Sequence, residues 1–192
     1  MSNTTEPQVA STSRAATDDA PSVPRPPSEL EAASFYDGLP SKPPLVARSS
    51  TYVWEPPTGP DGQPLAKMLC PFPFDHAFKD VWQDKVAPEV TSYLDAKGVK
   101  FNYIMPICFR YADPDEWPPT STPVLWMGVE PGSLSAEEGV EVAVHCREIL
   151  LAHDVDDIHV EICESRVHRS PYVAPSEPRR GKKKKPNRSR KY

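Results

Sequence analysis

The sequence predicts an α+β domain with the βαββαβ order of a ferredoxin-like plait, flanked by disordered segments. Three observations lead to this prediction. Residues 157–164 alternate between polar and apolar side chains, which is typical of a strand with one buried face. Ser135 and Glu138 have the S-x-x-E spacing of a capping box, which starts a helix. The 192 residues include 25 prolines but only 8 glycines, so parts of the chain cannot form regular structure.

Proline content and charge divide the chain into three parts. Residues 1–48 contain 8 prolines and little apolar side-chain area, so we expect a disordered segment rich in Pro, Ser and Thr. Residues 49–165 form the expected acidic α+β domain. Residues 166–192 are basic, and we expect them to be disordered as well.

The predicted order starts with one strand and one helix. Residues 51–54 are β-prone, and without this strand a three-stranded αββαβ variant remains. Asp75 can cap a helix that Pro88 breaks or kinks and that stops at Gly98. The apolar side chains of this helix have helical spacing: Phe78, Val81, Trp82, Val86, Val90, Tyr93 and Leu94.

Two strands are expected next, at residues 101–111 and 123–129, because both runs are rich in β-branched and aromatic residues. They should form a hairpin with a long loop, since residues 113–119 are acidic and rich in proline. Pro106 lacks the N–H group that a central strand needs, so it indicates a sheet edge or a bulge.

The second helix and the last strand complete the predicted order. The helix that starts at Ser135 carries its apolar side chains on one face: Val142, Ala143, Cys146, Ile149 and Leu150. In the strand that follows, Ile158, Val160 and Ile162 are expected to face inward. Three side chains should face outward: His159, Glu161 and Cys163.

His159, Glu161 and Cys163 are candidate ligands of a metal ion because they share one strand face. Zinc needs about four convergent ligands, and the sequence has neither a C-x-x-C nor an H-x-x-x-H motif. We therefore predict no metal site and no cofactor. We also predict no catalytic residues, since residues 128–135 lack the lysine of a phosphate loop and no G-x-S-x-G motif occurs.

Cysteine usage and hydropathy indicate an intracellular protein. Residues 1–14 carry no apolar segment typical of a secretion signal, so we expect the four cysteines to be free thiols. Cys70 is expected to pack against the core. No run of 18 apolar residues occurs, so we expect no membrane partner.

Charge is segregated along the sequence. Residues 49–164 hold 7 basic and 20 acidic side chains, which opposes binding of a polyanion by the domain itself. From residue 165 onward, 11 basic residues accompany a single acid, Glu177. We expect this basic segment to contact an import receptor or nucleic acid, and we favour a nuclear over a cytoplasmic location. Its candidate contact residues are Arg179, Arg180, Lys182, Lys183, Lys184, Lys185, Arg188, Arg190 and Lys191.

Four stretches carry a family resemblance: residues 52–57, 72–76, 123–135 and 160–165. They resemble the N-terminal region of a large family of proteins from mushroom-forming (basidiomycete) fungi, whose function is not established. The resemblance covers residues 50–170. The resemblance implies that, in longer relatives, a segment similar to a trypsin-like peptidase follows this region. This sequence has basic residues after the region instead.

The function that we expect is a non-catalytic accessory or protein-interaction domain, because the sequence offers a core and a charged surface but no catalytic pattern. One alternative, implied by the resemblance, is a fragment or accessory region of a hydrolase-like fungal enzyme. A second alternative is association with nucleic acid through the basic segment.

Overall fold

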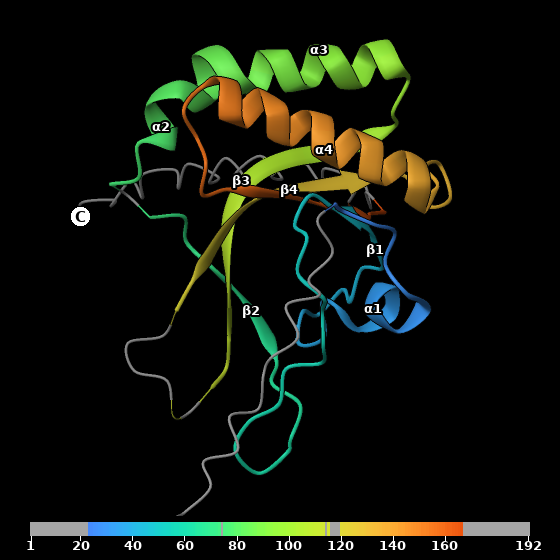
Figure 1. The fold of residues 1–192 in the computed structure, drawn as a ribbon, viewed down its shortest axis with the longest axis vertical. Coiled ribbons are helices and arrows are strands. Elements are labelled where there is room, and N and C mark those ends of the chain that lie inside the picture. The colour runs from blue at the N-terminus through green and yellow to red at the C-terminus, as the bar shows by residue number, and fades with distance from the viewer. Residues whose placement is uncertain (1–22, 74, 114, 116–119, 167–192) are drawn as a thin grey trace, which may run out of the picture.

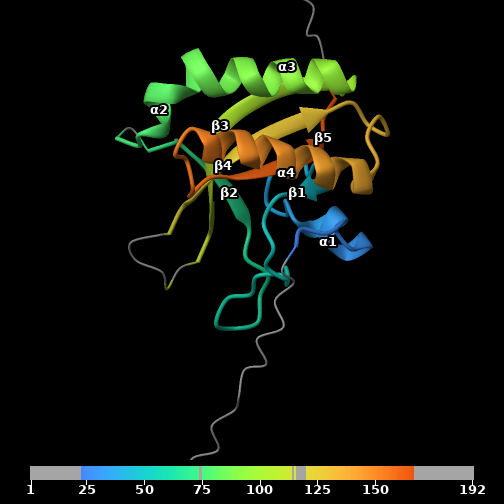
Figure 2. The same ribbon diagram turned by 45° about the horizontal axis from the view of Figure 1, so that its top comes forward.

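A five-stranded mixed sheet forms the centre of the computed structural model, which describes residues 23–73, 75–113, 115 and 120–166. Helices α3 (Ala87–Lys97) and α4 (Ala136–Ala152) cover one face of the sheet, and the short helix α1 (Glu29–Ser34) lies on the opposite side (Figures 1 and 2). The expected α+β class is confirmed. The strands are β1 (Leu45–Arg48), β2 (Lys67–Cys70), β3 (Phe101–Tyr111), β4 (Thr122–Val129) and β5 (His159–Glu164).

The spatial strand order, β1-β5-β4-β3-β2, is not that of a simple ferredoxin-like plait. Strands β4 and β5 are adjacent and parallel, and α4 crosses between them. In a plait, the two strands joined by a helix are separated by a third strand. Strands β1 and β2 form the two edges of the sheet, where they pair antiparallel with β5 and β3.

The helix that precedes β3 continues through Pro88, where the sequence predicts a break or a kink. It consists of α2 (Phe78–Val81), the π-helical segment η1 (Trp82–Val86) and α3. The N–H of Ala87 donates to the carbonyl of Trp82, five residues earlier. Because Pro88 has no N–H group and its ring crowds the carbonyl four residues earlier, a widened turn accommodates it. The predicted stop is confirmed, since Gly98 caps α3 in the left-handed region with φ of 69°.

The predicted hairpin of β3 and β4 is confirmed, with Ile104 opposite Met127 and Phe109 opposite Thr122. Strand β2 pairs with only the last four residues of β3, from Cys108 to Tyr111. At Pro106, β3 therefore borders β4 alone, which agrees with the predicted edge position.

The predicted start of α4 is also confirmed. The Ser135 side chain accepts from the Glu138 N–H, and the Glu138 carboxylate accepts from the Ser135 N–H, both at 3.2 Å. This capping box satisfies donors that the first turn of a helix leaves unpaired. The expected apolar face packs on the sheet, and Val142, Ala143, Cys146 and Leu150 are buried.

The expected domain boundary at residue 49 is wrong, because α1 and β1 lie before it. The expected strand at residues 51–54 is wrong too, since those residues belong to no strand. The boundary error has a physical cause: the apolar side chains of residues 35–45 are buried on the second face of the sheet, which offsets the disorder that proline-rich composition favours. This second core contains Phe35, Tyr36, Leu39, Leu45, Phe109, Val124, Trp126 and Cys163.

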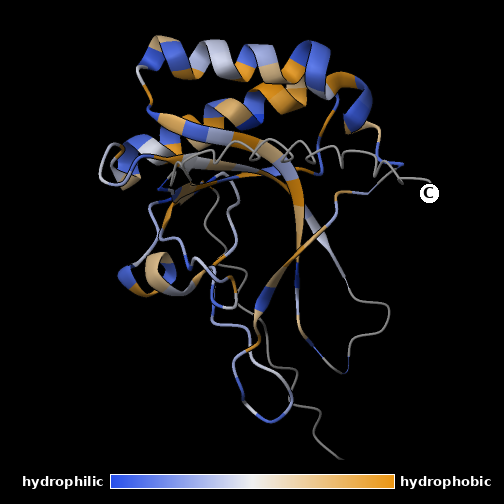
Figure 3. Ribbon diagram, turned by 180° about the vertical axis from the view of Figure 1, so that it is seen from behind, coloured by the Kyte–Doolittle hydropathy of each residue, from blue (hydrophilic) through white to orange (hydrophobic). Residues whose placement is uncertain are grey.

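Apolar residues are concentrated on the sheet and on the helix surfaces that face it (Figure 3). The main core lies between the sheet and helices α3 and α4, where Ile158, Val160 and Ile162 are buried as expected. The second core lies on the α1 side. Strand β5 is thus covered on both faces: of the side chains expected to face solvent, Glu161 and Cys163 are buried and His159 is half-buried.

Gly38 is a position where the fold requires glycine. Its φ is 103°, and a Cβ atom there would lie 2.6 Å from both the backbone nitrogen and the oxygen of Lys67. We expect Gly38→Ala to lower the free energy of unfolding by at least about 3 kcal/mol, because backbone strain and a backbone clash add. Urea denaturation measures this loss.

The matched control is Gly62→Ala, where φ is 71° and no atom lies within 4 Å of the added Cβ. This control should cost only about 1 kcal/mol, the strain of the left-handed region. Equal losses in the two variants would contradict the close approach of residue 38 to β2.

Candidate ligand pocket

The three candidate metal ligands share one face of β5 but contact different partners. Oε2 of Glu161 accepts from the Tyr36 hydroxyl at 2.9 Å, and His159 Nδ1 lies 3.3 Å from Ser49 Oγ. Cys163 Sγ lies 3.3 Å from the Tyr103 hydroxyl. Among the described residues, no group of three or more His, Cys, Asp or Glu side chains is arranged to hold a metal ion. The basic candidates from Arg179 to Lys191 lie outside the described residues.

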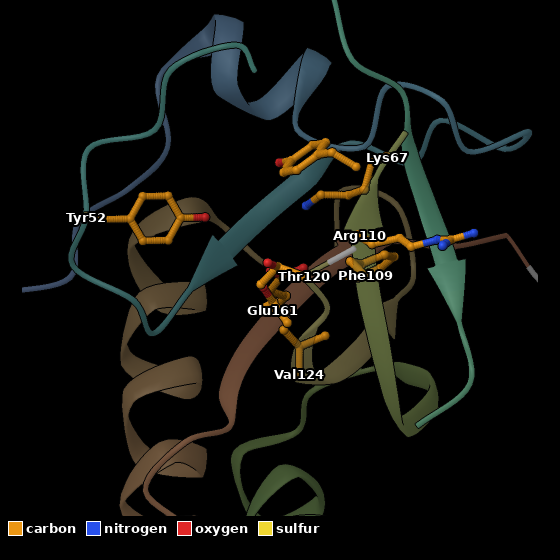
Figure 4. A pocket seen from close by; sticks show the side chains of 9 residues that line it. Tyr52, Lys67, Phe109, Arg110, Thr120, Val124 and Glu161 are labelled. Carbon is orange, nitrogen blue, oxygen red and sulfur yellow. The ribbon is translucent and has the colours of Figure 1, made fainter. Parts of the chain in front are cut away.

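A pocket of about 180 Å³ lies on the α1 side of the sheet and includes Glu161 in its wall. The Tyr52 hydroxyl, the Lys67 amino group and the Glu161 carboxylate point toward the same space, whereas the Arg110 side chain extends away from it (Figure 4). The pocket therefore combines an amino group and a carboxylate from two strands with hydroxyls from β4 and the neighbouring segments. Its lining residues are Tyr52, Lys67, Phe109, Arg110, Tyr111, Thr120, Thr122, Val124 and Glu161.

Lys67 is buried at the start of β2, with only 4% of its surface exposed. Its Nζ atom lies 3.5 Å from the centroid of the Phe35 ring and 4.8 Å from the centroids of Tyr36 and Phe109. Ring faces attract a cation but do not replace the hydrogen bonds that water gives an ammonium group. Burial therefore lowers the pKa of Lys67, and the negative charge of Glu161 opposes this shift.

Glu161 is a buried carboxylate on a central strand, with 7% of its surface exposed. The donor that faces it is the hydroxyl of Tyr36, which is itself almost fully buried. Burial raises the pKa of Tyr36 well above its ordinary value, and the charge of Glu161 raises it further. Tyr36 consequently keeps its proton and remains a hydrogen-bond donor to Glu161 at all physiological pH values.

A buried ion pair holds the chain segment that closes the pocket. Arg48 Nε lies 2.7 Å from Oε1 of Glu31 in α1, and the Arg48 guanidinium also donates to the carbonyls of Ser50 and Tyr52. The guanidinium carbon lies 4.1 Å from the centroid of the Tyr52 ring. These contacts fix Tyr52 over the sheet, so the wall of the pocket is ordered by α1 and β1.

Most of this pocket is not marked by any pattern in the sequence. The sequence indicates Glu161 only as a candidate metal ligand, and nothing in the sequence marks Lys67 as a functional residue. Tyr36 and Arg48 lie in the segment expected to be disordered. The lining residues come from β2, β3, β4 and β5 and from the segments around Tyr52 and Thr120, which are far apart in the sequence, so no local motif marks them.

No protein-family model, curated protein or solved structure matches this chain. In the part of the chain that the structure describes, no helix is both long and apolar enough to cross a membrane. The resemblance to fungal proteins stays a prediction. Function is therefore inferred from the chemistry of the pocket itself.

Arg48→Met should strongly destabilise the fold. The substitution leaves Glu31 buried without its partner, which typically costs about 3–5 kcal/mol. Adding Glu31→Met in a double variant should recover part of this loss, because two apolar side chains leave no unpaired charge. Urea denaturation of the three proteins provides the comparison.

Lys42→Met is the matched control, since Lys42 and Asp37 form an exposed ion pair with 3.2 Å between Nζ and Oδ1. We expect a change of less than about 1 kcal/mol. If Arg48→Met costs no more than this control, the Arg48 and Glu31 pair does not hold the segment over the pocket.

Proposed function

We propose that this chain is a non-catalytic binding domain whose pocket holds a small polar molecule. The observation that carries the proposal is the placement of Lys67 and Glu161 in the wall of one pocket without an ion pair or hydrogen bond between them. Among the described residues, the Lys67 amino group forms neither a hydrogen bond nor an ion pair. Buried amino and carboxylate groups are normally paired, so this arrangement favours a bridging ligand.

The ligand chemistry follows from the groups that face the pocket. An anionic group of the ligand can pair with Lys67, and a hydroxyl or amino group can donate to Glu161. The hydroxyls of Tyr52, Thr120 and Thr122 can fix its orientation. The volume of about 180 Å³ equals that of about six liquid waters. We therefore propose small hydroxy acids and amino acids as the ligand class.

Binding is tested with a panel of lactate, glycerate, alanine and serine, using thermal shift and titration calorimetry on the full chain. At least one compound should raise the unfolding midpoint at millimolar concentration, because a ligand that binds the folded state stabilises it. Lys67→Met and Glu161→Gln should each weaken that binding at least about tenfold, since each removes one charge contact.

Lys100→Met is the matched control, because Lys100 is exposed and does not line the pocket. It should bind as the unmodified chain does. The proposal is refuted if no compound binds, or if Lys67→Met binds with unchanged affinity while remaining folded.

We also propose nuclear import through the basic segment as a second function. The supporting observation is compositional: from residue 165 onward the sequence has 11 basic residues and one acid. Such a run is typical of segments read by import receptors or held by phosphates. At cellular ionic strength, single exposed ion pairs with the acidic domain contribute only about 0–1 kcal/mol, so they do not outcompete a receptor.

Changing Lys182, Lys183, Lys184 and Lys185 to alanine should abolish nuclear enrichment of the chain. Fluorescence microscopy measures this in a fusion that is too large to diffuse passively into the nucleus. Changing the exposed Lys97 and Lys100 to alanine is the control and should leave the distribution unaltered. An even distribution of the unmodified fusion would show that the basic segment does not direct import.

A further inference from the structure

We propose that Cys70 and Cys108 form a modification site, a pair of thiols that a peroxide oxidises to a disulfide across β2 and β3. The two residues are directly opposite in the antiparallel register of these strands. Their side chains are also close enough for each thiol to influence the pKa of the other. This inference is independent of the ligand proposed for the pocket.

The strand geometry suits a disulfide. Directly opposite residues of an antiparallel pair have Cα atoms about 4.5–5.5 Å apart, which lies inside the range of about 4.4–6.8 Å found for disulfides. Cβ atoms of such a pair project to the same side of the sheet. Closing the bond therefore requires no change in register or strand order.

The difference in exposure between the two thiols determines which one reacts first. Cys70 is half-buried at the end of an edge strand, whereas Cys108 is buried. A peroxide therefore meets Cys70 first: the sulfur attacks one peroxide oxygen, the O–O bond breaks, and a sulfenic acid and one water form. The sulfur of Cys108 then attacks the Cys70 sulfur, the S–O bond breaks, and a second water leaves. Two thiols and one hydrogen peroxide thus yield one disulfide and two waters.

The other two cysteines lack this arrangement. Cys146 and Cys163 are fully buried, the first in α4 within the main core and the second on β5 within the second core. Neither stands opposite a cysteine in the described sheet register. Oxidation of the folded chain should therefore select one pair among the four thiols.

The rate of closure should rise with pH. Burial raises the pKa of both Cys70 and Cys108, although nearby Arg110 acts in the opposite direction on Cys70. The thiolate is the reactive form, so its population continues to grow above the ordinary thiol pKa of about 8.5. We expect slow closure near pH 7 and several-fold faster closure near pH 9.

The experiment oxidises the reduced, folded full chain with hydrogen peroxide and then alkylates the remaining thiols in denaturant. The expected product has lost about two hydrogens in mass. Two thiols should remain to be alkylated, at Cys146 and Cys163, and peptide mapping should link Cys70 to Cys108. The oxidised chain should also unfold at a midpoint higher by roughly 5 °C, because the bond restricts the unfolded chain.

Three variants provide the controls. Cys70→Ser and Cys108→Ser should each abolish the linked peptide, and Cys146→Ser should retain it. A chain oxidised in urea should give mixed pairings, which shows that the native strand register selects the pair. The proposal is overturned if folded chains yield intermolecular dimers, a sulfinic acid at Cys70 without a link, or any other pairing.

Discussion

The hydrogen bond from Tyr36 to Glu161 joins the N-terminal part of the described chain to the centre of the sheet. A carboxylate on a strand covered from both sides is costly unless a donor faces it, and Tyr36 is that donor. The same ring lies 5.6 Å from Phe109 and 5.8 Å from Trp126, measured between centroids. Polar and apolar contacts of one residue thus close the second core, and α1, β1 and the pocket depend on that closure.

Local signals predicted the elements that form locally. The capping box of Ser135 and Glu138, the stop at Gly98 and the inward side chains of β5 are each encoded within a few residues, and each is confirmed. The second face of the sheet is different, because its cover comes from residues about 125 positions away from β5, as for Tyr36 and Glu161. Burial over such a separation leaves no periodic pattern that a sequence window can detect.

The order of the strands in the sheet also depends on contacts between distant parts of the sequence. A strand, helix, strand order allows both a split crossover, as in a plait, and a crossover between neighbours, as with β4 and β5. The choice depends on which other strand takes the place beside β5. Here β1 takes the outer position, where Val46 and Ala47 meet Gly139 of α4, a helix position with no side chain. A larger residue at 139 would push α4 away from β1.

For the proposed binding function, the placement of charge limits which ligands the pocket can select. The sequence around it is strongly acidic, with 20 acidic and 7 basic residues between positions 49 and 164, so an anion approaching from solvent is repelled at long range. Inside the pocket, the buried Lys67 attracts an anionic group at short range, where water screens little. A ligand that carries a cationic or donor group beside its anionic group is still attracted by Lys67 at short range. Its lower net negative charge weakens the long-range repulsion by the acidic domain. The same groups on the ligand complement Glu161, so the acidic exterior and the pocket chemistry favour zwitterions over simple anions.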